Sequence, residues 1–255
     1  MGVLLNVNNL VMEFGGIKAV DNLCFTVQEG EIKAIIGPNG AGKTTVFNAI
    51  TKAYQPTSGE IWLGDVNLTP LPQYKIIEHG ISRTFQNIRL LDSLSVLENV
   101  IVGYDSKLNS GFFSSLLRTP LQKREEAEAK EKAMEALKFM GIDNKANLSV
   151  SSLAYGDRRK VEIARALISK PRLILLDEPA AGMNPLETQE LMEIIRKIRT
   201  ESRSVLLIEH DLRLALGISE KVVVINFGKK IADDTPYEIR QNPEVIEAYL
   251  GKEVS

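Results

Sequence analysis

One stretch of the sequence decides the fold: Gly37-Pro38-Asn39-Gly40-Ala41-Gly42-Lys43-Thr44-Thr45. An apolar run of strand length precedes it at residues 32–36, and residues 46–50 have the composition of a helix. A glycine-rich turn that joins a strand to a helix and ends in Gly-Lys-Thr is typical of a phosphate loop. Its glycines allow backbone N–H groups to surround a polyanion, and the start of the helix adds unsatisfied donors and a positive dipole end. The stretch therefore predicts a nucleoside triphosphate site.

Two side chains of this loop have expected roles. Lys43 would reach the β- and γ-phosphates as a mobile point charge, and Thr44 would place its hydroxyl on Mg²⁺. The alternative is an ordinary strand–helix turn whose glycines occur by chance. Nine residues fit both the pattern and its context, so we favour the phosphate loop.

Composition limits the classes of function. The chain has 255 residues, of which 44% are hydrophobic and 25% charged, with a formal net charge of −2. These values are ordinary for a globular protein and do not indicate a surface for nucleic acid. A single cysteine excludes a framework of intrachain disulfides, and we expect this residue, Cys24, to be a small core side chain. No apolar run approaches the ~20 residues that cross a bilayer, so a membrane role would come through a partner.

The order of the expected elements predicts an α/β chain. Strands alternate with helices on both sides of a helix-rich stretch, which indicates a parallel sheet covered by helices, with antiparallel strands near the N-terminus. We expect one domain over residues 1–255, with a nucleotide-binding core at 1–86 and 166–255 and a helical subdomain at 87–165. Individual expectations include strands at 81–86 and 173–178, a loop at 109–115 and a helix at 158–168.

Acidic side chains follow a second buried strand. Four apolar residues end in Asp177 and Glu178, which places both carboxylates at the carboxyl edge of the sheet, where ligands of α/β proteins bind. Asp177 is the expected acceptor in the Mg²⁺ sphere, and Glu178 can orient or deprotonate a water. His210 follows another buried strand. A histidine at a strand end is more often a surface or capping residue, but its place beside these two motifs favours a functional role.

Phe14 is a further candidate. It stands just before the turn Gly15-Gly16, where its ring could support an adenine base. Packing in the core is the alternative, and from the residues alone that alternative is favoured.

Together, these segments resemble the ATP-binding-cassette ATPases in order and spacing. The decisive one is the signature segment Leu153-Ala154-Tyr155-Gly156-Asp157, because other phosphate-loop ATPases lack it. The resemblance covers nearly the whole chain and implies a head-to-tail dimer with two ATP molecules between the phosphate loop of one subunit and the signature of the other. It implies that Phe14 stacks on adenine, that Gln86 contacts metal and water and links to a transmembrane partner, that Glu178 is the general base, and that His210 senses the γ-phosphate.

Other segments are similar to the first of the two ATPase subunits in high-affinity branched-chain amino acid importers. They are residues 83–90, 117–120, 180–185 and 242–251. This resemblance implies a second ATPase subunit, two transmembrane permease subunits and an external solute-binding protein that acts indirectly. It also implies a peripheral position on the cytoplasmic face of the inner or plasma membrane. Related branches import urea, short amides or other amino-acid-like solutes.

The chain departs from the usual family pattern at four positions. Ala154, Tyr155 and Asp157 stand where Ser, Gly and Gln are usual, and Asn184 stands where most relatives have Asp. Without a hydroxyl at Ala154, the opposing ATP loses one donor, worth roughly 1.5–3 kcal/mol. Two alternatives to an importer remain. A soluble cassette protein of DNA maintenance, cluster assembly or translation is disfavoured by the charge and the single cysteine, and a phosphate-loop kinase would not explain the signature or His210.

Overall fold

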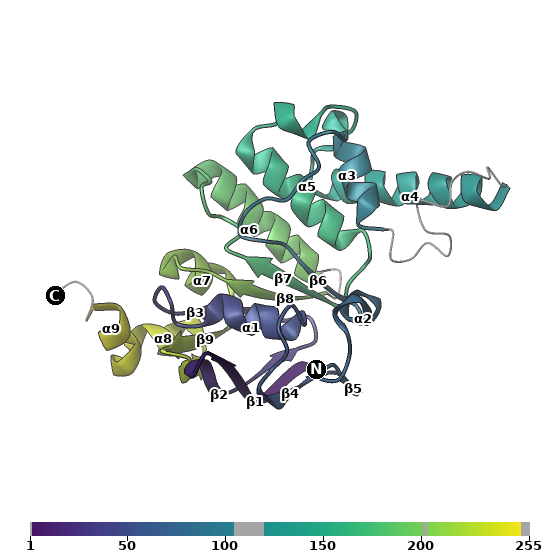
Figure 1. Ribbon diagram of the computed structural model, residues 1–255. Coiled ribbons are helices and arrows are strands. Elements are labelled where there is room, and N and C mark those ends of the chain that lie inside the picture. The colour runs from purple at the N-terminus through teal and green to yellow at the C-terminus, as the bar shows by residue number, and fades with distance from the viewer. Residues whose placement is uncertain (1, 105–119, 201–202, 251–255) are drawn as a thin grey trace. The chain divides into compact units, whose positions relative to one another are not determined.

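The computed structural model describes residues 2–104, 120–200 and 203–250, and Figure 1 labels most of their helices and strands. The chain divides into two compact units. The first consists of Met1–Arg83, Arg172–Pro179 and Ile195–Ser255, and the second of Thr84–Pro171 and Ala180–Ile194. The second unit thus extends beyond the helical segment expected at 87–165 and includes a stretch that follows the carboxylate pair.

The first unit holds two sheets. The smaller is antiparallel, in the order β2 (Ile17–Gln28), β1 (Val3–Phe14), β4 (Ser58–Leu63) and β5 (Val66–Asn67). The larger has the order β10 (Lys229–Asp234), β9 (Lys221–Asn226), β3 (Ile32–Ile36), β8 (Ser204–Ile208), β7 (Leu173–Asp177) and β6 (Ile81–Arg83). Its strands pair in parallel except at β10, which pairs antiparallel with β9. The predicted fold class is confirmed.

The helices of the first unit are α1 (Lys43–Ile50), α2 (Gln73–Glu78), α7 (Leu212–Ile218), α8 (Pro236–Gln241) and α9 (Pro243–Leu250). Those of the second are α3 (Val96–Val102), α4 (Pro120–Phe139) and α5 (Tyr155–Leu167), with short 3₁₀ turns at Asp143–Lys145 and Val150–Ser152. The helix α6 (Pro185–Thr200) begins in the second unit and ends in the first. No helix in the described parts of the chain combines the length and apolar character needed to cross a membrane.

Burial explains why the central strands form. Every residue of β3, β7 and β8 is buried, as expected for strands of a parallel sheet that are covered on both faces. The apolar side of α1, which includes Val46, Phe47 and Ile50, packs in one core with residues of both sheets. The phosphate loop is therefore held between a buried strand and a helix that the core fixes.

Several local expectations need correction. The strand expected to reach Gln86 ends at Arg83, and the signature helix begins at Tyr155, three residues earlier than expected. Cys24 lies on the opposite face of β2 from the buried Leu23 and Phe25, and its Sγ accepts a hydrogen bond from the backbone N–H of Asn9. The helix α8 was not predicted, and the loop expected at residues 109–115 lies outside the described residues.

Candidate functional site

The phosphate loop follows β3 and leads directly into α1. Gly42 precedes the helix with a φ of 103°, and a Cβ there would lie 2.4 Å from the carbonyl oxygen of Ala19. At Gly37 a Cβ would lie 2.0 Å from the carbonyl oxygen of Ile225. Only glycine fits at these two positions, because neighbouring backbone approaches too closely for a side chain. The loop thus has the tight path that a cradle of backbone N–H groups requires.

Lys43 is folded back over this loop. Its side chain is buried, and Nζ donates to the carbonyl oxygens of Gly37, at 2.7 Å, and of Pro38, at 3.0 Å. The ammonium group therefore lies over the turn itself, where a phosphate group would meet it. Thr44 follows in the first turn of α1 and is exposed, so its hydroxyl is accessible to a ligand.

The two acidic side chains and His210 lie at the same edge of the sheet as the loop. The strands β3, β8 and β7 are neighbours and run parallel, so their carboxyl ends meet at one edge. Asp177 is the last residue of β7, and its register partner is Ile208 at the end of β8. The sequence predicted this placement, because Asp177 and Glu178 end one buried apolar run and His210 comes two residues after another.

Glu178 has an unusual backbone. Its φ is 45°, a region that residues other than glycine seldom adopt, and its N–H donates to the carbonyl oxygen of Ile208 at 3.0 Å. Strained backbone of this kind occurs often at functional sites. Glu178 Oε2 lies 3.7 Å from His210 Nδ1, and the imidazole is 56% exposed whereas the carboxylate is 17% exposed. The mostly buried Glu178 carboxylate thus lies beside a mostly exposed histidine.

Arg83 was missed by the sequence analysis. Its Nη2 lies 2.7 Å from Asp177 Oδ2, and both side chains are buried. Nη1 donates to Asn48 Oδ1 at 2.7 Å, and the guanidinium lies over the ring of Phe47, with 5.5 Å from Cζ to the ring centroid. Arg83 is the first residue of the segment 83–90, which resembles the importers, but nothing in the sequence pairs it with a carboxylate 94 residues away.

The donor set suits a magnesium–triphosphate ligand. Magnesium in such sites takes one or two protein oxygens and completes its sphere with water and phosphate oxygens. Thr44 offers a hydroxyl at the start of α1 and Asp177 a carboxylate at the end of β7, while no cluster of three or more His, Cys, Asp or Glu in the described residues could hold a metal by itself. These residues therefore fit a metal that is bound together with phosphate, rather than a protein cage.

Gln86 and the signature segment lie in the second unit. Gln86 is exposed, and its carbonyl oxygen accepts a hydrogen bond from Arg159. Ala154 is the N-cap of α5 and, as its side chain requires, makes no side-chain cap hydrogen bond. In the first turn Gly156 is buried, and Asp157 pairs with Lys145. The start of α5 thus leaves Ala154 and Tyr155 exposed.

Phe14 does not lie in the core. It is 44% exposed at the end of β1, and its ring meets that of Tyr54 edge to face, with 5.4 Å between the centroids. The alternative that Phe14 serves core packing is therefore wrong. An exposed aromatic pair is compatible with a stacking role.

Comparison with known proteins identifies the family. A family model described as ABC transporter matches residues 20–181. The chain belongs to the ABC transporter family. A second model, described as Branched-chain amino acid ATP-binding cassette transporter, matches residues 229–255 of this ABC protein. The predicted resemblance to ATP-binding-cassette ATPases is confirmed, and the kinase alternative is wrong.

Curated relatives match the ABC chain over almost its whole length. One is the high-affinity branched-chain amino acid transport ATP-binding protein LivG of Salmonella typhimurium, 48% identical over 250 residues and matched over 98% of each chain. Another is the high-affinity branched-chain amino acid transport ATP-binding protein BraF of Pseudomonas aeruginosa, with the same identity and coverage.

Solved structures of ATP-binding cassettes have the same fold as this chain. A nucleotide-free ATP-binding cassette from an ABC transporter superposes with a TM-score of 0.85 at 31% identity, over 97% of this chain and 98% of the other. A dimeric cassette in a post-hydrolysis state with ADP and Pi has a TM-score of 0.77 at 25% identity, over 91% of this chain and 99% of the other. The chain is an ABC ATPase, which binds and hydrolyses ATP.

Proposed function

We propose that this chain is the ATPase subunit of an importer for branched-chain or related amino acids. The main support is that Lys43, Asp177, Glu178 and His210 follow neighbouring parallel strands to the same edge of the sheet. The names of the relatives that are 48% identical, together with the C-terminal match at residues 229–255, support the solute class. Urea, short amides and other amino-acid-like solutes remain the alternative substrates, and a soluble, non-transport role is the alternative function.

In this proposal each side chain has one task. Backbone N–H groups at residues 37–45 and Lys43 bind the phosphates, and Phe14 stacks on adenine. Thr44, Asp177 and Gln86 would hold Mg²⁺, which would supply positive charge to the β- and γ-phosphate oxygens. Glu178 accepts a proton from the attacking water, and His210, 3.7 Å from that carboxylate, senses the γ-phosphate.

The proposal also covers assembly. The signature residues Ala154, Tyr155, Gly156 and Asp157 complete the ATP site of an opposing subunit. That subunit is a second, different ATPase, and the pair works with two permease subunits and, through them, with an external binding protein. The chain then lies at the cytoplasmic face of the membrane. The proposed functional division has the nucleotide core at 1–86 and 166–255 and the helical part at 87–165, whereas the second compact unit also includes Ala180–Ile194.

Glu178→Gln tests the chemical half of the proposal. The change keeps the size and hydrogen-bonding groups of the side chain but removes its basicity, so the chain should bind Mg²⁺-ATP normally while hydrolysis falls by at least roughly 100-fold, within the usual contribution of a general base. Glu190→Gln is the matched control, because Glu190 is an exposed carboxylate that pairs with Lys160. Parent-like hydrolysis by Glu178→Gln would assign the base to another residue.

The solute class is tested in liposomes that hold the chain with the membrane subunits that copurify with it. Leucine, isoleucine and valine should each stimulate hydrolysis when the copurified binding protein is present, and urea and acetamide should not. Stimulation by urea or acetamide, but by none of the three amino acids, would indicate an importer of the related amide branch. Lack of any membrane subunit in the purified complex would favour the soluble alternative.

A further inference from the structure

A buried ion pair lies on α5 just after the signature segment. Arg159 is 0% exposed and Glu162 is 1% exposed, and Nη1 of the arginine lies 2.7 Å from Oε2 of the glutamate. Burial raises the pKa of the Glu162 carboxyl, against which the charge of Arg159 acts in the opposite direction. A buried pair of charges carries a desolvation penalty that an apolar pair would avoid, so it is weak support for stability by itself. Its contacts indicate another role.

The pair holds the backbone of the Gln86 segment. Arg159 Nη1 donates to the carbonyl oxygen of Phe85 at 2.7 Å, and Nη2 donates to that of Gln86 at 2.8 Å. Glu162 Oε1 accepts from the N–H of Phe85 at 3.3 Å. Residues 84–90 lie outside helices and strands, so regular backbone pairing does not fix their path. Two side chains of α5 bind this backbone: Arg159 donates to its carbonyl groups, and Glu162 accepts from one of its N–H groups.

The same arginine reaches back to the signature. Nη2 lies 3.3 Å from Tyr155 Oη, and the guanidinium lies over the Tyr155 ring, with 6.0 Å from Cζ to the centroid. The Tyr155 ring also lies against the loop that follows Asp177 and Glu178, since a Cβ at Gly182 would lie 3.3 Å from Tyr155 Cε1. Within the second unit, Arg159 thus contacts residues 85–86 and Tyr155 of the signature, and Tyr155 in turn lies beside the loop that contains Gly182.

We propose that Arg159 and Glu162 are positioning residues that fasten the backbone of Gln86 to the signature helix, so that the two segments move as one piece. Arginine is required because a planar fork can donate to two successive carbonyl groups and a carboxylate at once, whereas a lysine ammonium group is a single point. The functional meaning rests on the proposed function: a shift of the Gln86 segment, caused by a membrane subunit, would reach the residues that face the opposing ATP.

The test uses the full-length chain and hydrogen–deuterium exchange of the peptides that cover residues 84–91. Arg159→Lys retains the positive charge beside Glu162 but not the fork, and Glu162→Gln retains the acceptor for Phe85 but not the charge. Each should accelerate exchange in these peptides roughly tenfold or more, as expected when a hydrogen bond to a charged group is weakened. Arg158→Lys is the matched control, because the guanidinium of this neighbour pairs with Asp92, at 3.4 Å, rather than with the backbone of residues 85–86.

Two results would overturn the proposal. One is unchanged exchange at residues 84–91 in both variants, and the other is equal acceleration in all peptides, which indicates a general loss of stability. ATP affinity, measured on the same samples, should stay within about twofold of the parent, since the phosphate loop belongs to the other compact unit. In the assembled transporter both variants should hydrolyse ATP with reduced solute stimulation. The exchange result does not depend on which solute is carried, so failure of the proposed function would leave it standing.

Discussion

Arg83 Nη2 lies 2.7 Å from Asp177 Oδ2, and the two side chains are 8% and 2% exposed. The arginine also donates to Asn48 Oδ1 at 2.7 Å and to Thr51 Oγ1 at 3.3 Å. Asn48 lies on α1 and Thr51 directly follows it. Arg83 therefore links Asp177, the carboxylate proposed for Mg²⁺, to α1, the helix that follows the phosphate loop. One side chain thus positions both the loop helix and the carboxylate of the nucleotide site.

Replacing this arginine should destabilise the chain strongly. Arg83→Met removes one cation that pairs with the buried Asp177 carboxylate, and loss of one partner of a buried pair costs about 3–5 kcal/mol. Arg172→Met is the control, since Arg172 pairs with Glu29 at 3.2 Å on the surface and exposed pairs contribute about 0–1 kcal/mol. Urea unfolding of both full-length variants measures the difference. Equal, small losses would mean that Asp177 is solvated well enough without Arg83.

Nucleotide capture should depend on Lys43. Lys43→Ala removes the ammonium group that lies over the loop, while the loop's N–H groups remain. The affinity for Mg²⁺-ATP should fall roughly 100-fold or more, or about 2.8 kcal/mol, and turnover should be lost. Fluorescent-nucleotide titration measures the affinity, and Lys75→Ala, which removes an exposed partner of Glu78, serves as control. Near-native hydrolysis by Lys43→Ala would contradict the assignment of the phosphate loop.

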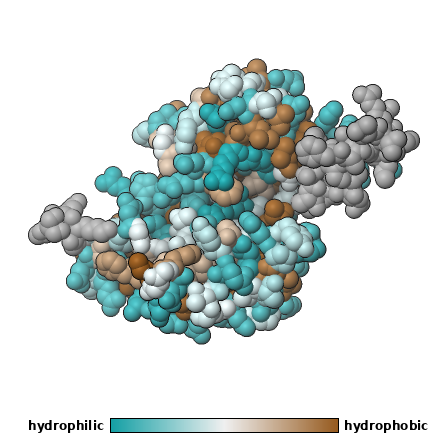
Figure 2. All heavy atoms as spheres, in the orientation of Figure 1, coloured by the Kyte–Doolittle hydropathy of each residue, from teal (hydrophilic) through white to brown (hydrophobic). Residues whose placement is uncertain are grey.

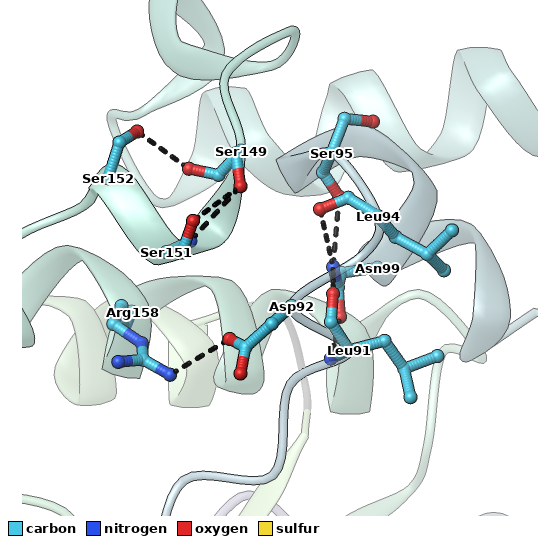
Figure 3. A network of polar contacts seen from close by, with 9 residues as sticks. All are labelled: Leu91, Asp92, Leu94, Ser95, Asn99, Ser149, Ser151, Ser152 and Arg158. Carbon is cyan, nitrogen blue, oxygen red and sulfur yellow. Dashed lines mark hydrogen bonds and ion pairs between the residues drawn. The ribbon is translucent and has the colours of Figure 1, made fainter.

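A docking surface for a membrane subunit is expected between Gln86 and Leu97. The side chain of the fully buried Asn99 holds the backbone of Leu91, with 2.8 Å from the Leu91 N–H to Asn99 Oδ1 and 3.1 Å from Asn99 Nδ2 to the Leu91 carbonyl oxygen (Figure 3). The Leu91 side chain is nevertheless 47% exposed, so it does not fill the core of the helical unit. Figure 2 shows hydrophobic surface gathered over α3 and α5.

Leu91→Asp should therefore uncouple solute transport from hydrolysis and leave ATP binding by the isolated chain unchanged. An apolar groove that accepts an amphipathic helix would lose that contact when a charge enters it. Leu148→Asp is a matched control, because Leu148 is 48% exposed in the same unit but lies outside the segment. Transport by the reconstituted complex and urea unfolding separate the two effects. A parallel fall in transport and stability would favour a packing role for Leu91.

Ala154 should make the dimer asymmetric. In a head-to-tail pair its methyl group faces the partner's ATP, so a homodimer lacks the serine hydroxyl at both sites, whereas a pair with a serine-containing subunit lacks it at one. Each missing contact is worth roughly 1.5–3 kcal/mol. Glu178→Gln chains in ATP should thus dimerise poorly alone and better with the second ATPase, as light scattering would show, and Ala154→Ser should improve self-association. If the chain with Ala154 forms tight homodimers in ATP, the replacement of the usual serine by Ala154 does not weaken dimerisation.

Much of the first unit could be predicted from local patterns. The strands β3, β7 and β8 are short apolar runs, and the predicted side chains of the sheet edge stand at their ends or in the loops that follow them. Burial and periodicity act within a few residues, so a single sequence reveals them. The helix α8, which was not predicted, carries an equally local signal, a capping box of Thr235 and Glu238 with proline in the first turn.

The sequence by itself determined the phosphate loop, the carboxylates that follow β7 and the family. Only the tertiary structure decided which groups hold them. Arg83 and Asp177 are 94 residues apart, and Arg159 is 74 residues from Phe85. Such pairs depend on strand order and on how helices pack, and no local sequence pattern encodes either. A buried charge pairs with the group that the completed fold places within about 3 Å of it.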